Sequence, residues 1–516
     1  MTVEFRYGKR DWLIAAALVL VTALLFGLQM TRGVPYWGDD FAAYLSEGIA
    51  ISEGRLAQQA ALNPGMHPSP LPAEAGRGAL VYAWGFPLSL SLVYQLAGFD
   101  RTAFDSLIYY KLPSLIAFAL IAGILYLYYR RRFSMGLSAF LAGVFAAGSR
   151  LMPVIDHLYA DVYFLFFCML AFWLWDCMQS AVLDDSRKLL PFVQAVLLGL
   201  TLFMVYETRL NGLTVIVILA AGQMIRIARQ PKKYSIRHIA ACCLPYAVFF
   251  AVRLLAESMF LPATSNMSDV GSVSFIRVIE NIGYYFGTTA QYLYRLSMPV
   301  SLVLLPLSFF ALFIGIYEKG FKWENLHLTF FILATYFVLV ILPYVQGIRY
   351  LFNILPFLMM YMAYGGIRLF RWVQQKKPSW NVRRMGAILA AAVLVCTFGT
   401  ALYQGIANQV QGGQPEKEDV YSPEAVDMYR FIQAQTPEDA VIAFIKPRAL
   451  YLNTQRLSFR PGINGHELME ADYYLQCTYP IQDETEPDEQ LQRHISRLNI
   501  EYENPSFVLY RVIKAE

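Results

Sequence analysis

The chain has 516 residues, of which 57% are hydrophobic and only 16% are charged, and its mean hydropathy is +0.41. A soluble protein of this length carries more charge, and several apolar runs are long enough to cross about 30 Å of hydrocarbon. The composition therefore excludes a soluble enzyme and indicates a polytopic membrane protein. No basic patch of the kind that binds nucleic acid stands out in the sequence.

The first apolar run, residues 13–30, follows Arg6, Lys9 and Arg10. A signal peptide begins in the same way, but this run is long for one, and residues 32–35 offer no cleavage site of small residues. We interpret the run as a retained first transmembrane helix.

Further apolar runs bring the expected number of transmembrane helices to about eleven. They cover residues 107–129, 136–153, 161–177, 190–206, 212–225, 239–256, 296–317, 327–344, 350–366 and 386–403. With a cytoplasmic N-terminus, half of the 42 Lys and Arg residues fall in inner segments, as the positive-inside rule requires. Residues 84–98 are apolar but short, and counting them as a span would place Arg130–Arg132 outside. We therefore expect an interfacial or re-entrant helix there.

Two regions have the composition of segments outside the membrane. Residues 31–106 form a long outer loop, rich in Pro and Gly, in which we expect at least two interfacial helices. Residues 404–516 have an ordinary soluble composition, and an odd number of spans places them outside. Their pattern predicts helices over 422–435 and 489–500 and strands over 440–445 and 506–513. The sequence thus predicts a transmembrane catalytic domain, residues 1–403, and a small extracytoplasmic α/β domain, residues 404–516.

Two adjacent carboxylates, Asp39 and Asp40, follow the first span in the stretch WGDDFAAYLSEG, residues 37–48. On a helix, Asp40, Tyr44 and Glu47 share one face because of their i, i+4, i+7 spacing. The opposite face, expected to contact lipid, consists of Phe41, Leu45 and Ile49. The alternative interpretation is that Gly38 and Asp39 only cap an interfacial helix.

Three other outer connections also carry ionisable residues at the edge of apolar runs. They contain Arg150, Asp156, His157 and Asp161 before the fourth span, Glu207 and Arg209 after the fifth, and Arg349 and Tyr350 before the tenth. Such residues are costly at membrane depth and tend to line functional cavities, although each alone is explained as well by snorkelling or a structural ion pair. Because all the clusters lie on one side, we expect a shared outer cavity. His157 alone, and still more His67 in the Pro-rich loop, fit a structural role better than ligation.

These motifs resemble the GT-C superfamily of membrane glycosyltransferases, in particular protein O-mannosyltransferases and the bacterial lipid A aminoarabinose transferase. The resemblance rests on Asp39-Asp40 with Tyr44-Leu45, Trp84–Leu88, Asp161, Thr208–Gly212, Arg349–Leu351 with Pro356, the strand 440–442 and Arg448–Leu452. The acidic pair is Asp-Asp rather than the commoner Asp-Glu, which blurs which carboxylate is the base. Gly85-Phe86 departs from the usual Pro-Pro-Leu motif, which leaves the subfamily and the acceptor open.

The resemblance implies an inverting glycosyltransferase in the bacterial inner membrane, with a polyprenyl-phosphate sugar as donor and a lipid, glycan or protein as acceptor on the outer face. We expect Asp40 to be the general base, Asp161 to orient the acceptor or to support Asp40, and Asp39 to be the better helix cap. The donor phosphate is expected at Arg209, Arg349 and Tyr350, and further substrate contacts at Tyr44, Glu47, His157 and Glu207. No cofactor is required, although a divalent metal ion bridging Asp39 and Asp40 to the phosphate is compatible with the pattern.

Two other classes of protein are alternatives to an enzyme. A transporter or lipid flippase often has repeated halves and spans broken near the midplane, whereas this sequence has no visible repeat and collects its polar residues at one face. A non-catalytic scaffold leaves Arg209 and Arg349 at membrane depth unexplained.

Overall fold

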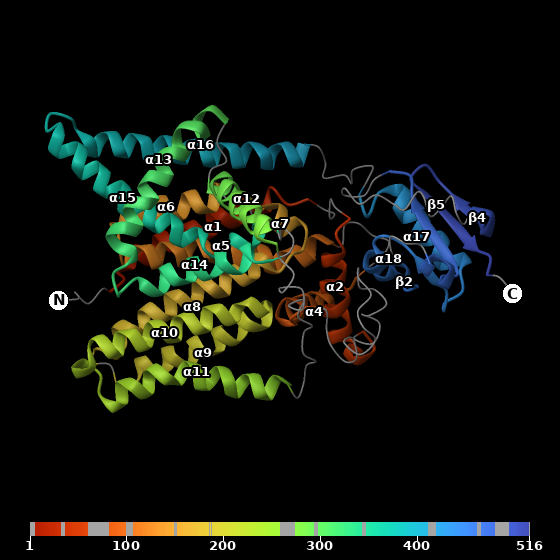
Figure 1. Cartoon of the computed structure of the whole chain (residues 1–516), viewed down its shortest axis with the longest axis horizontal. Helices are drawn as coiled ribbons and strands as arrows, with labels where there is room; N and C mark the ends of the chain where they lie inside the picture. The colour runs from red at the N-terminus through yellow and green to blue at the C-terminus, as the bar shows by residue number, and fades with distance from the viewer. Residues whose placement is uncertain are drawn as a thin grey trace.

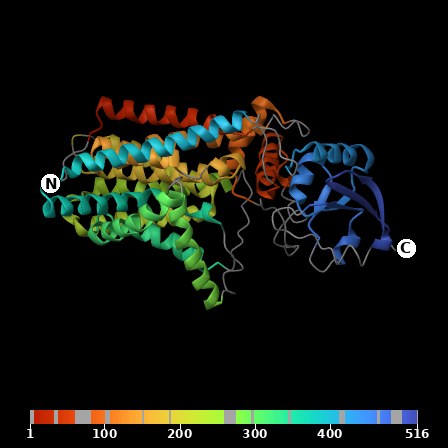
Figure 2. The same ribbon diagram turned by 90° about the horizontal axis from the view of Figure 1, so that it is seen from above.

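The computed structural model describes residues 6–31, 37–59, 82–99, 107–148, 152–184, 186, 188–257, 274–293, 298–342, 347–410, 419–461, 466–479 and 495–514 (Figure 1). Arg150 and the Pro-rich segment with His67 lie outside these residues. A bundle of long helices forms one part of the molecule and a small sheet domain the other, with the N-terminus at the far end of the bundle (Figures 1 and 2).

The apolar runs of the sequence all fall on helices of the bundle. These are α1 (Lys9–Gly27), α5 (Leu107–Arg130), α6 (Met135–Gly148), α8 (Asp161–Val182), α9 (Leu190–Thr208), α10 (Leu213–Arg229), α11 (Ile236–Glu257), α13 (Met298–Gly315), α14 (Leu326–Val340), α15 (Leu355–Lys376) and α16 (Val382–Val410). Within the described ranges, seven helices are long and apolar enough to cross a membrane: α1, α5, α8, α9, α10, α11 and α16. The prediction of a polytopic helical membrane protein is therefore confirmed. The expected domain boundary at residue 403 falls inside α16.

Shorter elements connect these helices. They are α2 (Asp39–Ser52), α4 (Gly85–Ala97), α7 (Met152–Asp156), α12 (Phe275–Leu293), the 3-10 turns η2 (Leu210–Gly212), η3 (Pro231–Lys233) and η6 (Ile348–Leu351), and the π-helical turn η5 (Ile316–Gly320). The helices α2 and α4 are the two expected in the outer loop.

Helix α4 packs closely on α2 on one side and on the end of α9 on the other. A Cβ added at Gly48 of α2 would lie 2.9 Å from the carbonyl oxygen of Pro87 in α4. One added at Gly85 would lie 2.6 Å from the carbonyl oxygen of Glu207, at the end of α9. Only glycine permits these two approaches, so they fix α2 against the end of the bundle.

The C-terminal residues fold into a mixed five-stranded sheet with the order β2-β1-β3-β5-β4. The strands are β1 (Val441–Ala443), β2 (Leu457–Phe459), β3 (Tyr473–Cys477), β4 (Leu498–Glu503) and β5 (Phe507–Val512). β1 is parallel to β2 and β3, with Val441 opposite Leu457, whereas β5 is antiparallel to β3 and β4, with Leu475 opposite Leu509. Helices α17 (Pro423–Gln435) and α18 (Pro447–Thr454) and the 3-10 turns η7 (His466–Glu470) and η8 (Ile495–Arg497) complete the domain.

The predicted α/β architecture of this domain is confirmed, including α17, whose N-cap Ser422 accepts a hydrogen bond from the Ala425 amide at 3.2 Å. The helix expected over 489–500 is wrong at its described end, because residues 498–500 belong to β4 and pair with β5. Pairing with the next strand of the chain, β5, outweighs the helical spacing of this short segment.

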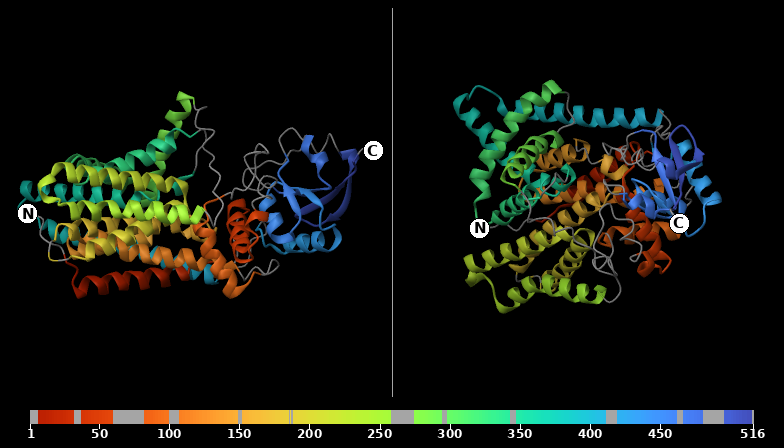
Figure 3. Two further views of the ribbon diagram at one scale, coloured as in Figure 1. Left: turned by 90° about the horizontal axis from the view of Figure 1, so that it is seen from below. Right: turned by 45° about the vertical axis from the view of Figure 1, so that its right-hand side comes forward.

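The short stretch between α1 and α2 joins the two parts of the molecule. Trp37 is only 2% exposed, and its indole N–H donates a hydrogen bond of 3.2 Å to the Tyr479 hydroxyl. Its ring also packs on Phe444 and Phe507 of the sheet domain, at centroid distances of 5.7 and 5.8 Å. Helix α2 consequently lies between the bundle and the sheet domain (Figures 2 and 3).

This position corrects one expectation about α2. The face of Phe41, Leu45 and Ile49 was predicted to contact lipid, but all three side chains are at most 3% exposed. They are buried because α4 packs on one side of the helix and α18 on another. The helix is therefore an internal element rather than one lying on a bilayer.

Candidate active site

Asp40 lies in the first turn of α2, where its carboxylate meets two donors from distant parts of the chain. The Tyr82 hydroxyl donates to Oδ1 at 2.5 Å, and the Arg349 Nη2 donates to Oδ2 at 2.9 Å. Both ionic side chains keep some contact with solvent, since Asp40 is 27% and Arg349 is 26% exposed. The carboxylate is therefore held in place but remains accessible.

Asp161 extends this cluster from the first turn of α8. It is 4% exposed and forms an ion pair with Arg209, which follows α9. Its other oxygen lies 4.0 Å from Nη1 of Arg349. The guanidinium of Arg209 stacks over the Tyr350 ring at 4.2 Å, and that of Arg349 over the Tyr159 ring at 4.2 Å. Two arginines thus lie side by side, each steadied by an aromatic face and a carboxylate.

Asp39 contacts the sheet domain instead. The N-cap of α2 is Gly38, without a side-chain capping bond, so the expectation that Asp39 caps this helix is wrong. Its Oδ1 instead accepts a hydrogen bond of 3.3 Å from the Ala449 amide, in the first turn of α18. Because adjacent positions on a helix point about 100° apart, one carboxylate serves the domain contact and the other the arginine cluster.

The two neighbouring carboxyls have pKa values shifted in opposite directions. Burial raises the pKa of Asp39 to about 6, against the smaller lowering effects of the charges of Arg448 and Lys446. Burial also acts on Asp40, but the Arg349 charge and the hydrogen bond from Tyr82 outweigh it and hold the pKa of Asp40 below its usual value. Asp40 is consequently ionised at neutral pH. The carboxyl of Asp39, with its pKa of about 6, gains or loses its proton near neutral pH.

The remaining residues predicted for the site lie around this cluster in different ways. Tyr44 is 6% exposed, and its ring stacks on that of Tyr82 at 4.5 Å. Glu47 is fully buried further along α2. Burial, together with the charges of Lys111 and Arg349, lowers the pKa of His157 to about 4. Glu207 lies 3.0 Å from Arg253 of α11, in an ion pair that joins two helices.

Several residues of the site were not assigned a role from sequence. Tyr82 lies just before α4, and Arg448 lies in the segment 448–452 that was noted only for its resemblance to other proteins. Lys111, which lies within an apolar run, is fully buried and bridges Asp156 at 2.8 Å and the Thr31 carbonyl at 2.9 Å. The sequence analysis missed Lys111, although a charged residue inside an apolar run is the signal by which it can be found.

The residues around Asp39 and Asp40 fit a metal ion poorly. Both carboxylates already accept hydrogen bonds from N–H or O–H donors, and cationic side chains surround them. In the described residues, no three His, Cys, Asp or Glu side chains gather in a way that could hold a metal.

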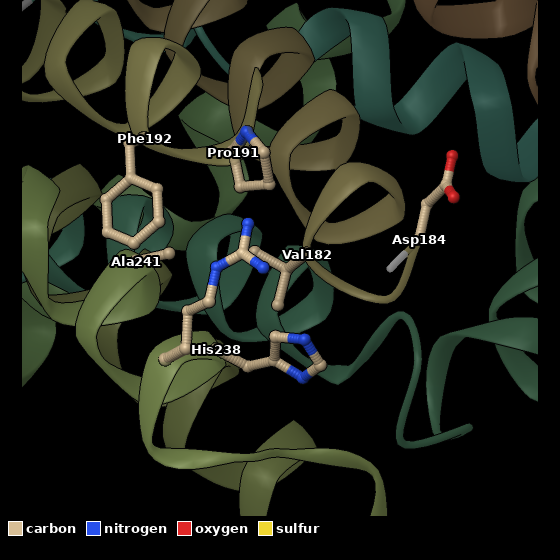
Figure 4. A pocket seen from close by; sticks show the side chains of 7 residues that line it. Val182, Asp184, Pro191, Phe192, His238 and Ala241 are labelled. Atoms are coloured by element: carbon tan, nitrogen blue, oxygen red, sulfur yellow. The ribbon is translucent and has the colours of Figure 1, made fainter. Parts of the chain in front are cut away.

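A small pocket lies at the other end of the bundle. It is lined by Val182, Asp184, Pro191, Phe192, Arg237, His238 and Ala241 (Figure 4). Val182 ends the helix that Asp161 begins, which places the pocket about 30 Å from the Asp40 cluster. It has no part in the site described above.

The order of the helices and the terminal sheet domain are shared with solved membrane proteins. Among solved structures, ArnT from Cupriavidus metallidurans bound to undecaprenyl phosphate is similar with a TM-score of 0.56, at 12% identity over 98% of this chain and 98% of that chain. The Archaeoglobus fulgidus oligosaccharyltransferase tethered with an acceptor peptide gives a TM-score of 0.55, at 10% identity over 91% of this chain and 69% of that chain. The archaeal oligosaccharyltransferase AglB in complex with an inhibitory peptide and a dolichol-phosphate gives 0.53, at 11% identity over 90% and 69%.

No protein-family model matches the chain, and no curated protein matches its sequence. The likeness is therefore one of fold, and it confirms the GT-C fold expected from the short motifs.

Proposed function

We propose that the chain is an inverting glycosyltransferase that moves a sugar from a polyprenyl-phosphate donor to an acceptor at the outer face of the membrane. The observation that carries this proposal is a cluster at one end of a membrane-spanning bundle, in which the ionised Asp40 pairs with Arg349 and the neighbouring Asp161 lies between Arg349 and Arg209. A base and an anion-binding cluster in contact are what glycosyl transfer from a lipid phosphate needs. Solved proteins of the same fold bind undecaprenyl phosphate or dolichol-phosphate.

Arg349 and Arg209 are the groups that we assign to the donor phosphate, with Tyr350 between them. Planar guanidinium groups bind phosphate oxygens through paired N–H donors, and the rings of Tyr159 and Tyr350 hold the two planes in place. Arg349 divides its donors between Asp40 and the neighbourhood of Asp161. An arriving phosphate competes for these donors, so Asp40 loses part of its counter-charge and its affinity for a proton rises.

The reaction follows from these contacts. An acceptor hydroxyl attacks the anomeric carbon from the face opposite the phosphate, and Asp40 takes the hydroxyl proton. The bond between the anomeric carbon and the phosphate oxygen breaks as the new glycosidic bond forms, which inverts the anomeric centre. The leaving polyprenyl phosphate keeps the electron pair, and Arg349 and Arg209 stabilise its developing charge.

The residues outside the cluster take smaller parts in this proposal. Tyr44 forms a wall of the site through its stack on Tyr82, and His157 stays neutral beside Arg349. Glu207 serves helix packing through Arg253 rather than substrate binding. The sheet domain lies at the same end of the bundle as Asp40, and we place that end outside a bacterial inner membrane with the N-terminus in the cytoplasm (Figure 2).

The proposal is tested by incubating the purified chain in lipid nanodiscs with radiolabelled polyprenyl-phosphate hexoses and a membrane extract as the source of acceptors. We expect release of polyprenyl phosphate together with label in a new product. Movement of the intact donor across a bilayer without release of polyprenyl phosphate would instead identify a lipid flippase and reject the enzyme.

A further inference from the structure

The buried arginine of the sheet domain, Arg448, reaches into the site of the membrane domain. It lies at the start of α18 and is only 5% exposed. Its Nη1 donates a hydrogen bond of 3.4 Å to the Tyr82 hydroxyl, and its guanidinium lies 5.8 Å from the Tyr82 ring. Tyr82 in turn donates to Asp40 at 2.5 Å. A chain of contacts thus runs from the sheet domain to the proposed base.

The bonding of Arg448 differs from that of a purely structural buried arginine. Arg456, in the same domain, is 8% exposed and donates from Nε, Nη1 and Nη2 to Gln433, Thr436 and Thr454. Arg448, by contrast, has a buried Nε without a hydrogen-bond partner in the described part of the chain. Buried donors are nearly always satisfied when an arginine serves packing alone. This contrast indicates that the place of Arg448 is set by the site it reaches.

The domain that carries Arg448 is fixed to the membrane part at the same point. Trp37 inserts between Phe444 and Phe507, and the Ala449 amide donates to Asp39. Three neighbouring residues thus make three different contacts. Trp37 packs in the core of the sheet domain, Asp39 binds α18, and Asp40 binds the arginine cluster. These contacts fix the position of α18 relative to Asp40.

We propose that Arg448 is a positioning residue of the transfer reaction, through which the sheet domain orients Tyr82 and sets the charge environment of Asp40. This inference rests on the proposed function. It makes the sheet domain part of the active site rather than a separate binding module. Its direct contacts are with Tyr82, so it acts on the reaction through another side chain.

The charged and titratable groups that face the acidic pair come from several elements. They are Tyr44 on α2 itself, Tyr82 before α4, Arg349 on η6, and Lys446 and Arg448 at the start of α18, with the Asp161–Arg209 pair behind Arg349. Loss of the Arg448 charge destabilises the carboxylate form of Asp40, so the pKa of this carboxyl rises. The base then becomes protonated at a higher pH, and the acid limb of the rate profile moves upward.

The test compares the pH dependence of polyprenyl phosphate release in Arg448→Gln, Arg448→Lys and Tyr82→Phe, with Arg430→Gln as control. The Arg430 side chain lies on α17 of the same domain and is 61% exposed. We expect Arg448→Gln to lower kcat about 10-fold and to move the acid limb upward by about 1 pH unit. Arg448→Lys keeps the charge, so kcat falls while the limb stays in place. Arg430→Gln changes neither.

Two outcomes overturn the inference while leaving the proposed function intact, provided that the parental chain transfers sugar. One is a parental rate and profile in Arg448→Gln. The other is an equal loss of rate at every pH, accompanied by a lower melting temperature, which marks a structural role. If Arg448→Gln does not fold, the test uses Tyr82→Phe and Arg448→Lys. The inference is then overturned if the acid limb of the pH–rate profile stays in place in Tyr82→Phe, or if Arg448→Lys keeps the parental kcat. A parental chain that releases no polyprenyl phosphate rejects the proposed function itself.

Discussion

Asp40 and Arg349 stand 309 positions apart in the chain and form an ion pair of 2.9 Å between Oδ2 and Nη2. The pair holds the proposed base against the proposed phosphate ligand before any donor is bound. Because Arg349 must serve two anions in turn, binding of the donor and activation of the base are coupled in the mechanism we propose.

Arg349→Lys separates charge from geometry at this pair. The lysine keeps a positive charge but loses the planar fork, so we expect the rate of transfer to fall about 10-fold, and roughly 10²–10³-fold in Arg349→Ala. Arg368→Lys is the matched control, since Arg368 lies on the following helix, is 58% exposed and pairs with Glu318 at 2.9 Å. The affinity of the two Arg349 variants for undecaprenyl phosphate should fall together with their rates of transfer. If Arg349→Ala and Arg209→Ala both bound undecaprenyl phosphate as tightly as the parental chain, the phosphate site would have to lie elsewhere.

Asp39 provides a test of the contact between α2 and the sheet domain. Burial raises its pKa to about 6, so the folded state favours the protonated form and loses stability as the pH rises through this value. Asp39→Asn removes the buried charge while keeping an oxygen for the Ala449 amide. We expect it to stabilise the protein by about 1–3 kcal/mol near pH 8 and hardly at all near pH 4.

Thermal unfolding of Asp39→Asn and the parental chain at these two pH values checks the prediction. A variant that is less stable than the parent at the higher pH would show that the carboxylate is needed in its ionised form.

Chelation addresses the question of a metal ion at Asp39 and Asp40. Because both carboxylates already accept hydrogen bonds and face arginines, we expect an excess of EDTA to leave the rate of transfer unchanged. A rate that falls with EDTA and returns with one divalent cation would require a metal bound together with the substrate.

The orientation of the chain can be tested without any substrate. The basic inner segments and the position of the sheet domain opposite the N-terminus lead us to expect an extracytoplasmic C-terminus (Figure 2). Protease added to intact spheroplasts should remove a C-terminal tag and spare an N-terminal one. Protection of the C-terminal tag would reverse the assignment of sides and place the Asp40 cluster in the cytoplasm.

Local signals in the sequence sufficed for the helices and for the end of the bundle at which the polar residues meet. Long apolar runs define membrane helices by themselves, and the spacing of α2 and α17 predicts helices in the right places. The alternation of basic segments places Asp40, Asp161, Arg209 and Arg349 on one side. It says nothing about which of them touch, because the contacts join residues far apart in the chain.

The contribution of the sheet domain could not be predicted for the same reason. The burial of Phe41 and Leu45 depends on α18, far along the chain, docking on α2. The strand at 498–500 was missed for a different reason: it forms a hairpin with β5, the next strand, and its helical spacing hides this pairing. Asp39 looked like a helix cap because capping is the common use of Asp at that place. Its actual partner, the Ala449 amide, lies 410 positions away.

The most direct test of the account is the rate of sugar transfer by Asp40→Asn beside that by Asp39→Asn. Removal of a positioned base costs roughly 10²–10⁴-fold in rate, so Asp40→Asn should nearly abolish release of polyprenyl phosphate while its melting temperature stays near that of the parent. Asp39→Asn should keep most of the activity. Transfer at the parental rate by Asp40→Asn, or an Asp39→Asn variant that loses more activity than Asp40→Asn, would contradict the assignment of Asp40 as the base.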